Sequence, residues 1–577
     1  MKKISKELKE FIGSQQIKML MSINSWDRVY ALSGQQRLNS QLTQYLLSHT
    51  VGVNPFDYMK EIPNRAFENN TDLTSFIIPG NIKHIAEKAF YNCTNLKKIN
   101  IQNGVCSIAR YAFKGCSGLT EIVFPDSVKR IDDRAFNGCD SLLDLVLGKG
   151  VAYIGNLAFM GCAKLEKVIF SDNVETIGEE AFSGCDNLYK LSIGKCVNYI
   201  DPSAFCCCPK LNEIIVHKDN QDYYSNGDCL IKKDSKTLIK GYNNCVIPSD
   251  GSVSTIGQFA YKGNKDMTEI VIPKSVKVID EGAFEDCIRL NKVSILGDPT
   301  KIGSKAFSHC LRLYSITLPK TLTEIAEDSF LGCCCLIEVY NLSSLPVYAG
   351  SHGSGYVASH AKDVYCDTSS KSKLSKKDDY VLYREGEEVT VLGYLGTDSK
   401  LLLPEEITTI HHWAFANCNT IHSVVIPKSV KEIRIRAFTN CDALDEITVD
   451  KDNETFHSEG NCIIETKSKV LVVGCKNSVI PRDGSVTTIG KFAFAGCNGL
   501  EKIDIPNGVT MICEAAFNDC ENLNEVIVPD SVTLIEDYAF GSCALTTVFL
   551  ATGTEICDFS FDDDGVVKII WREKNEK

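Results

Sequence analysis

The sequence predicts a repeat solenoid of the α/β type, with short parallel strands, short helical or irregular turns and β-hairpin insertions. Two observations lead to this fold class. The pair Ala-Phe, or a close variant, recurs every 23 residues over long stretches, first at Ala66-Phe67 and last at Ala539-Phe540. Apolar residues also recur at fixed positions around each pair. Such self-similarity is typical of units that stack only on their neighbours.

Each repeat contains two structural periods, as the copy between Ile108 and Ile131 shows. The pattern reads I-x-x-x-A-F-x-x-C-x-x-L-x-x-I-x-I-P-x-x-V-x-x-I. In this copy Phe124 occupies the position of the isoleucine before the proline. The alternation of Ile122 and Phe124 with other residues predicts a short strand, and Pro125 ends it because proline cannot donate to a ladder. The Ala-Phe-x-x-Cys portion predicts a turn or a single helical loop. One repeat buries too little to fold alone, so neighbours must stack and pair their strands in parallel.

This pattern resembles the BspA-like, or Treponema-type, leucine-rich repeat over residues from about Asn64 to Phe561. The resemblance implies a right-handed leucine-rich-repeat solenoid. It also implies a protein-binding role, because such proteins are often displayed on microbial surfaces where they bind host or partner proteins.

Breaks in the repeat predict five regions. They are an N-terminal helical cap over 1–55, a first array over 56–345, an irregular linker with a β-hairpin over 346–400, a second array over 401–561, and a C-terminal cap and tail over 562–577. Glycine and serine in the linker are compatible with a hinge or with a continuous array.

Two insertions, at about 217–247 and 450–480, are copies of each other. Residues 218–231 match residues 451–464 at a constant offset of 233. Turn signals at Gly227 and Gly460 between apolar runs predict a β-hairpin in each. These hairpins extend the sheet or form a distinct binding surface.

Composition and charge limit the partners and the location. A net charge of −13 and a pI near 5.4 argue against nucleic acid, which needs a basic face. No apolar run approaches eighteen residues, so we expect no membrane span. No export signal is recognised near Met1, which predicts the cytoplasm; the alternative is the cell surface or secretion by an unrecognised route.

The 27 cysteines predict buried thiols, because about half of them recur at one position of the repeat. The runs at 206–208 and 333–335 and the pair His411-His412 raise the alternative of a metal site. Cys208 and Cys333 occupy the ordinary repeat position, however, and adjacent histidines on a turn need further ligands. We therefore expect no metal and no cofactor.

No sequence motif for catalysis is present. The chain lacks a Walker-type phosphate loop, an H-E-x-x-H motif and a G-x-S-x-G elbow. We therefore expect a protein that is not an enzyme and does not bind a small molecule.

The outward strand positions form the candidate binding surface, because side chains alternate along a strand. Their first column mixes both charges and their second is largely β-branched or aromatic, although strand propensity alone also favours such residues. The predicted surface residues are Lys98, Glu121, Val123, Asp144, Val146, Lys167, Ile169, Lys190, Glu213, Ile215, Glu269, Val271, Lys292, Glu338, Tyr340, Glu446, Thr448, Lys502, Glu525 and Ile527. The predicted function is a scaffold that binds a protein or peptide through this face; the alternative is a microbial cell-surface adhesin for host or matrix proteins.

Overall fold

The computed structural model describes residues 60–577, except 227–228, 243–245, 558, 562–566 and 574–577. The cap expected over residues 1–55 lies outside the described residues. The chain divides into two compact units. The first comprises Met1–Ile288, Ser294–Ser308 and Pro319–Leu331, and the second comprises Arg289–Val293, His309–Leu318 and Gly332–Lys577.

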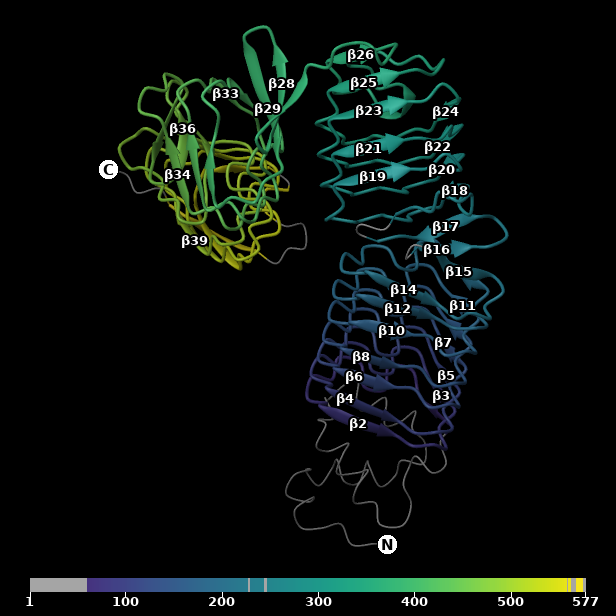
Figure 1. Cartoon of the computed structure of the whole chain (residues 1–577). Helices are drawn as coiled ribbons and strands as arrows, with labels where there is room; N and C mark the ends of the chain where they lie inside the picture. Colours follow the sequence, from purple (N-terminus) through teal and green to yellow (C-terminus); the bar gives the residue numbers. More distant parts are fainter. Residues whose placement is uncertain (1–59, 227–228, 243–245, 558, 562–566, 574–577) are drawn as a thin grey trace, which may run out of the picture. The chain divides into compact units, whose positions relative to one another are not determined.

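In the first unit each repeat contributes one strand to each of two parallel ladders (Figure 1). The longer strands are β2 (Ser75–Ile78), β4 (Lys98–Ile101), β6 (Glu121–Val123), β8 (Asp144–Val146), β10 (Lys167–Ile169), β12 (Lys190–Ile193) and β14 (Glu213–Val216). The two-residue strands are β1 (Glu61–Ile62), β3 (His84–Ile85), β5 (Ser107–Ile108), β7 (Arg130–Ile131), β9 (Tyr153–Ile154), β11 (Thr176–Ile177) and β13 (Tyr199–Ile200). The longer strands form sheets β2-β4-β6-β8 and β10-β12-β14, with β8 and β10 as neighbours.

The 23-residue repeat determines the register of the longer strands. Lys98 pairs with Glu121, and Glu121 pairs with Asp144 one repeat later. Within β4, Ile99 and Ile101 are buried, while Lys98 and Asn100 are exposed. The strands therefore place one side-chain row in the solenoid interior and the other on an outer face.

The Ala-Phe segments form turns that stack their rings in the interior. The rings of Phe90 and Phe113 lie 4.9 Å apart and 5° from parallel. The backbone N–H of Phe113 donates to the carbonyl of Ala135 in the next repeat, at 2.7 Å. Because such bonds run between repeats, these segments do not continue as helices. Of the two forms expected for them, the structure has turns; its described residues contain one short 3-10 helix, η2 (Ser354–Tyr356).

The first insertion is a three-stranded antiparallel meander, which adds one strand to the expected hairpin. Its strands are β15 (Tyr223–Asn226), β16 (Cys229–Lys232) and β17 (Thr237–Lys240). Strand β17 then pairs in parallel with the first of four two-residue strands: β18 (Thr255–Ile256), β20 (Val278–Ile279), β22 (Lys301–Ile302) and β24 (Glu324–Ile325). The insertion thus extends a sheet, as predicted. Two longer strands of these repeats, β19 (Glu269–Ile272) and β21 (Lys292–Ile295), pair separately.

The second unit repeats this architecture. Its longer strands are β23 (Ser315–Leu318), β25 (Glu338–Asn341), β26 (Asp363–Tyr365), β30 (Lys400–Leu402), β32 (Ser423–Ile426), β34 (Glu446–Val449), β39 (Lys502–Asp504), β41 (Glu525–Ile527), β43 (Thr547–Ala551) and β45 (Lys568–Arg572). Its two-residue strands are β31 (Thr409–Ile410), β33 (Glu432–Ile433), β38 (Thr488–Ile489), β40 (Met511–Ile512), β42 (Leu534–Ile535) and β44 (Glu555–Ile556). The second insertion forms β35 (Phe456–Glu459), β36 (Cys462–Glu465) and β37 (Val470–Val473).

The region expected as an irregular linker with a β-hairpin contains a three-stranded meander. The meander consists of β27 (Leu374–Lys377), β28 (Tyr380–Glu385) and β29 (Glu388–Tyr394), and it joins β31 in one sheet. It includes the antiparallel pair β28 and β29. Tyr383 of this meander is buried against Tyr314 and Ile337. The buried Arg312 guanidinium donates to the carbonyls of Tyr394 and Ala416, at 3.2 and 2.7 Å. These contacts lie inside the second unit and make the meander part of its core.

Candidate functional site

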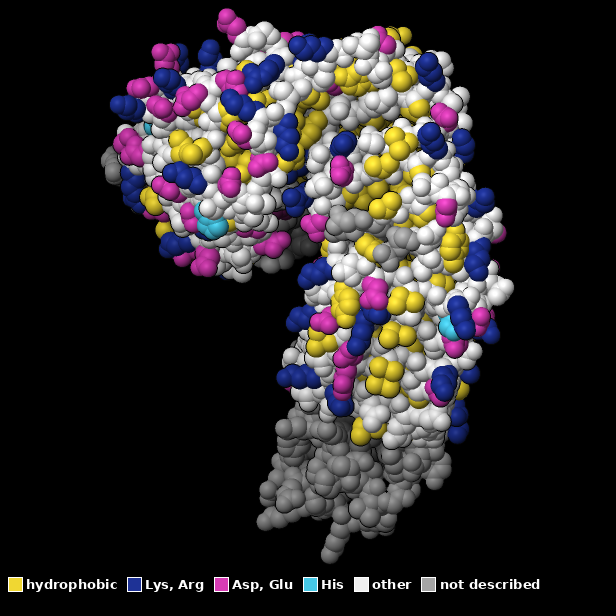
Figure 2. Space-filling view, viewed as in Figure 1, with side chains coloured by type: hydrophobic (Ala, Val, Ile, Leu, Met, Phe, Trp, Pro, Cys, Tyr) yellow, Lys and Arg dark blue, Asp and Glu magenta, His cyan; other side chains and the backbone are white. Residues whose placement is uncertain are grey.

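The outer face of the longer strands in the first unit carries two columns of side chains. We call the first the charged column: Lys98, Glu121, Asp144, Lys167, Lys190 and Glu213. We call the second the apolar column: Ile77, Val123, Val146, Ile169 and Ile215, interrupted by Asn100 and Ser192. Figure 2 shows apolar side chains beside a line of basic and acidic ones over these strands.

The apolar column is exposed because its strands bury the alternate residues. Val123, Val146 and Ile169 keep 55, 51 and 54% of their surface exposed. Their neighbours Ile122 and Val168 are buried in the core. Water-exposed valine and isoleucine on successive strands form an apolar stripe, a kind of surface that a protein partner can cover.

The charged column contains two ion pairs. Lys98 Nζ lies 2.9 Å from a carboxylate oxygen of Glu121, and Lys190 Nζ lies 2.7 Å from one of Glu213. These pairs are partly exposed, so each adds at most about 1 kcal/mol to stability. Their main effect is to hold charges of both signs beside the apolar stripe.

The other predicted surface residues lie on equivalent strands but in separate sheets. Glu269, Val271 and Lys292 are exposed on β19 and β21. In the second unit Glu446 and Thr448 on β34, Lys502 on β39, and Glu525 and Ile527 on β41 are exposed. The predicted residues of the first unit's columns thus lie on six successive longer strands, β4 to β14, of two adjoining sheets.

Glu338 was expected on the exposed face, and this expectation is wrong. The residue is fully buried. Its carboxylate accepts hydrogen bonds from the Ser372 hydroxyl and from the backbone N–H of Lys373, both at 2.7 Å. Tyr340 is half-buried and packs against Tyr365, with ring centroids 5.0 Å apart. The segment after β26 covers this part of the face.

Two exposed apolar residues of the same kind were missed in the sequence. Ile77 and Leu402 each keep 60% of their surface exposed. Ile77 lies 23 residues before Asn100. Ile77 and Leu402 each stand two positions before a proline, Pro79 and Pro404. The repeat spacing therefore contained the signal that identifies them.

The described repeat cysteines are buried, as the sequence predicted, except Cys543, which is half-buried. Burial raises the pKa of the Cys162 and Cys287 thiols to about 12. The described cysteines are all free thiols, and no described group of three or more His, Cys, Asp or Glu side chains could hold a metal ion. Burial lowers the pKa of His411 to about 3, and its Nδ1 lies 3.8 Å from the Cys335 Sγ. This histidine is therefore a neutral packing residue at neutral pH.

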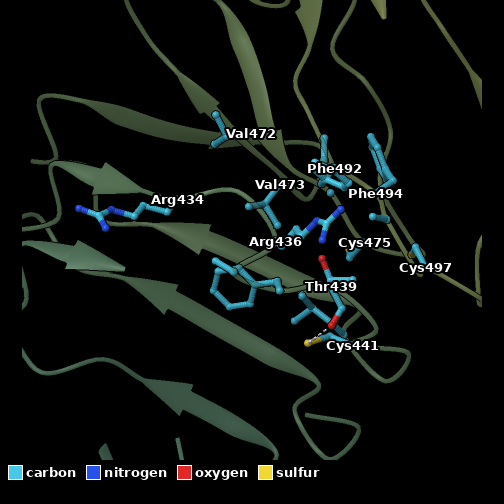
Figure 3. A pocket seen from close by; sticks show the side chains of 16 residues that line it. Arg434, Arg436, Thr439, Cys441, Val472, Val473, Cys475, Phe492, Phe494 and Cys497 are labelled. Carbon is cyan, nitrogen blue, oxygen red and sulfur yellow. Dashed lines mark hydrogen bonds between the residues drawn. The ribbon is translucent and has the colours of Figure 1, made fainter. Parts of the chain in front are cut away.

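A small cavity lies beside the second insertion (Figure 3). It has a volume of about 20 Å³, room for a single water molecule. The Arg436 guanidinium points inward and lies 3.8 Å from the Phe492 ring centroid, whereas Arg434 points away. An equivalent smaller cavity at Lys240 and Lys262 adjoins the first insertion. Both are too small for a substrate, and they mark where each meander interrupts the stacked repeats.

Comparison with known families decides which repeat this is. The family described as "BspA type Leucine rich repeat region (6 copies)" matches residues 60–156, 106–227, 240–348, 397–466 and 474–574. The chain belongs to this family. BspA-type repeats thus account for both arrays, and no curated protein matches the chain.

Solved structures with similar repeats come from several bacteria. A leucine-rich repeat protein of Bacteroides ovatus is 20% identical over 86% of this chain and 92% of its own, with a TM-score of 0.27. A leucine rich cell surface protein of Faecalibacterium prausnitzii is 20% identical over 89% and 83%, with a TM-score of 0.22. The pneumococcal vaccine antigen PcpA is 16% identical over 68% and 80%, with a TM-score of 0.39. Within the described residues, no helix has the length and hydrophobicity to cross a membrane.

Proposed function

We propose that this BspA-type repeat protein is a non-enzymatic scaffold that binds a protein or peptide through the outer face of its longer strands. The observation that supports this proposal is the exposure of Val123, Val146 and Ile169 on three successive strands. Covering an apolar stripe with another protein removes it from water, at about 25 cal/mol for each Å² buried. The neighbouring charged column supplies the polar rim that protein interfaces commonly have.

The charges of this face disfavour nucleic acid as the partner. The charged column contains three lysines and three carboxylates, so it has no net charge. Binding to a phosphate backbone needs a surplus of Lys and Arg to displace counterions. A protein with its own apolar surface and mixed charges fits the face better.

Substitution of the stripe tests the proposal. The triple variant Val123→Lys, Val146→Lys and Ile169→Lys should lose capture of partners from an extract of the source organism. Each captured protein is then purified and its affinity for the wild type and the variant is measured directly. Val246→Lys and Val479→Lys are matched controls, because these valines are also exposed but lie outside the columns. Equal affinity of the wild type and the triple variant, with unchanged circular dichroism, would contradict the proposal.

The alternative function is a cell-surface adhesin, and localisation separates it from a cytoplasmic scaffold. We propose the cytoplasm because the described cysteines are free thiols, which persist in a reducing compartment. Intact cells treated with external protease should leave a cytoplasmic chain uncut, with its thiols reduced. Cleavage under these conditions would favour the adhesin.

A further inference from the structure

The charges of the charged column have an order that is complementary to its own reverse. From β4 to β14 the signs read plus, minus, minus, plus, plus, minus, for Lys98, Glu121, Asp144, Lys167, Lys190 and Glu213. Read from β14 to β4, every sign is the opposite of the one at the same place in the forward order. A surface with this property matches a second copy of itself that runs the other way.

The isolated column leaves like charges on neighbouring strands. Glu121 pairs in register with Asp144, and Lys167 pairs with Lys190. Like charges directly opposite each other across a ladder repel. Asp144 and Lys167 are exposed, and neither forms an ion pair with another described residue. The middle of the column therefore lacks the neutralisation that its two ends have.

We propose that a second copy of this chain binds this face, related to the first by a two-fold axis that runs along the strands between β8 and β10. This inference rests on the proposed function and names the partner of the same surface. In this arrangement each column faces its own counterpart in reversed order. Lys98 then lies opposite Glu213 of the second copy, Glu121 opposite its Lys190, and Asp144 opposite its Lys167.

The arrangement surrounds each charge with opposite ones. The ion pair of Lys98 with Glu121 meets the pair of Glu213 with Lys190 in the second copy, which makes a square of alternating charges at either end. At the centre, Asp144 and Lys167 of the two copies make a third such square. Every like-charged pair of neighbours thereby gains an opposite charge from across the interface.

Strand spacing favours a second solenoid over an extended peptide. Strands in a ladder lie about 4.8 Å apart, so two copies present side chains at the same interval along their full length. An extended peptide lying along the ladder would present side chains to it every ~6.7 Å, because alternate residues point away. After a few strands, the side chains of such a peptide no longer lie opposite the side chains of the columns.

The apolar column fits the same two-fold axis. Val146 faces Ile169 of the second copy, and the reverse contact repeats on the other side of the axis. Further from the axis Val123 faces Ser192 of the second copy and Ile215 faces its Asn100. Only the central contacts are therefore fully apolar, and the outer ones pair an apolar with a polar side chain, as the rim of an interface admits. The six strands span only about 24 Å, and the contact is smaller than the roughly 800 Å² per partner of stable complexes. The association is therefore reversible and depends on concentration.

Sedimentation velocity on the full chain tests the inference. Between about 1 and 200 μM in low salt, the mean sedimenting mass should rise from one chain towards two. In 0.5 M salt the dimer should be weakened at least tenfold, because a Debye length of roughly 4 Å screens the exposed ion pairs. A chain that stays monomeric over the whole range in low salt overturns the inference.

Charge exchange at the centre identifies the face and the orientation. Asp144→Lys places lysine against lysine at the axis, and Lys167→Asp places aspartate against aspartate, so each variant alone should dimerise at least tenfold more weakly. An equimolar mixture of the two variants should recover the dimer, because at both contacts a lysine of the Asp144→Lys variant faces a carboxylate of the Lys167→Asp variant. A mixture that dimerises no better than either variant alone overturns the inference.

Matched controls come from exposed charges beside the two-residue strands. Glu179→Lys and Lys129→Asp make the same kind of charge change outside the columns and should dimerise as the wild type does. Failure of this inference is distinguishable from failure of the proposed function. If the chain is monomeric but the triple lysine variant still loses affinity for another protein, the second copy is not the partner. The proposed binding face is then still supported.

Discussion

The Sγ of Cys116 lies 3.1 Å from the carbonyl oxygen of Phe90, 26 residues earlier, and donates a hydrogen bond to it. The same carbonyl accepts the backbone N–H of Cys93. The thiol therefore uses the remaining acceptor capacity of a buried carbonyl. The same contact recurs between Cys441 and Phe415, at 3.0 Å. This explains how cysteine, a small apolar residue with a weak donor, suits this position of the repeat.

Replacement of a repeat cysteine should destabilise the fold by a small, measurable amount. Cys139→Ala removes a fully buried sulfur and its bond to the Phe113 carbonyl. We expect the free energy of unfolding to fall by about 1 kcal/mol, as for other small core deletions. Urea denaturation followed by circular dichroism measures the change. Cys196→Ala is the control, because Cys196 is exposed, and an equal effect of both substitutions would contradict the explanation.

The buried thiols should make the protein unstable at alkaline pH. Burial raises the pKa of Cys162 from 9.0 to about 12, so the folded state keeps a proton that the unfolded state releases above pH 9. Stability from this thiol is fully present below pH 9 and is lost as the pH rises towards 12, at about 1.4 kcal/mol per pH unit.

Urea denaturation between pH 8 and 10.5, with reductant present, checks this pH dependence. The free energy of unfolding should fall with rising pH, and Cys162→Ala should reduce the slope. A free energy that stays level or increases over this range would show that the thiols ionise in the folded state.

The repeat spacing predicts the main contacts of the candidate face, because register follows from it. Lys98 lies next to Glu121 since they are 23 residues apart in equivalent strands. The ladder of two-residue strands was not predicted. A strand such as Arg130–Ile131 is too short to show an alternating pattern. The burial of Glu338 could not be foreseen either, because the segment that covers it is distant in the sequence and leaves no pattern around Glu338.

Glu338 should control the order of the segment that covers it. Glu338→Ala removes the acceptor of the Ser372 hydroxyl and of two backbone N–H groups, those of Lys373 and Leu374. Hydrogen bonds to a charged group contribute about 1.5–3 kcal/mol each, so local opening should become at least about tenfold more frequent. Limited trypsin digestion should then cut faster after Lys371 and Lys373. Glu324→Ala, at an exposed glutamate, should leave this rate unchanged.

The last strand of each insertion is followed by a glycine, because an aromatic ring of the next repeat occupies the space of a side chain. A Cβ on Gly474 would overlap the Phe494 ring, and one on Gly241 would overlap the Tyr261 ring. Gly474→Ala should therefore lower the free energy of unfolding by about 1–3 kcal/mol, the usual effect of overpacking. Gly353→Ala is the control, because its new Cβ meets no atom closer than 3.4 Å.

The ring should be the cause of the Gly474 effect. In a Phe494→Leu background, where a smaller side chain can shift, Gly474→Ala should destabilise the protein less than it does in the wild type. Urea denaturation of the four proteins in this double-mutant cycle measures the coupling. Strictly additive effects would mean that the alanine is opposed by the backbone and not by the aromatic ring. A positive coupling would explain why both copies of the insertion, 233 residues apart, return to the repeat through glycine followed 20 residues later by an aromatic residue.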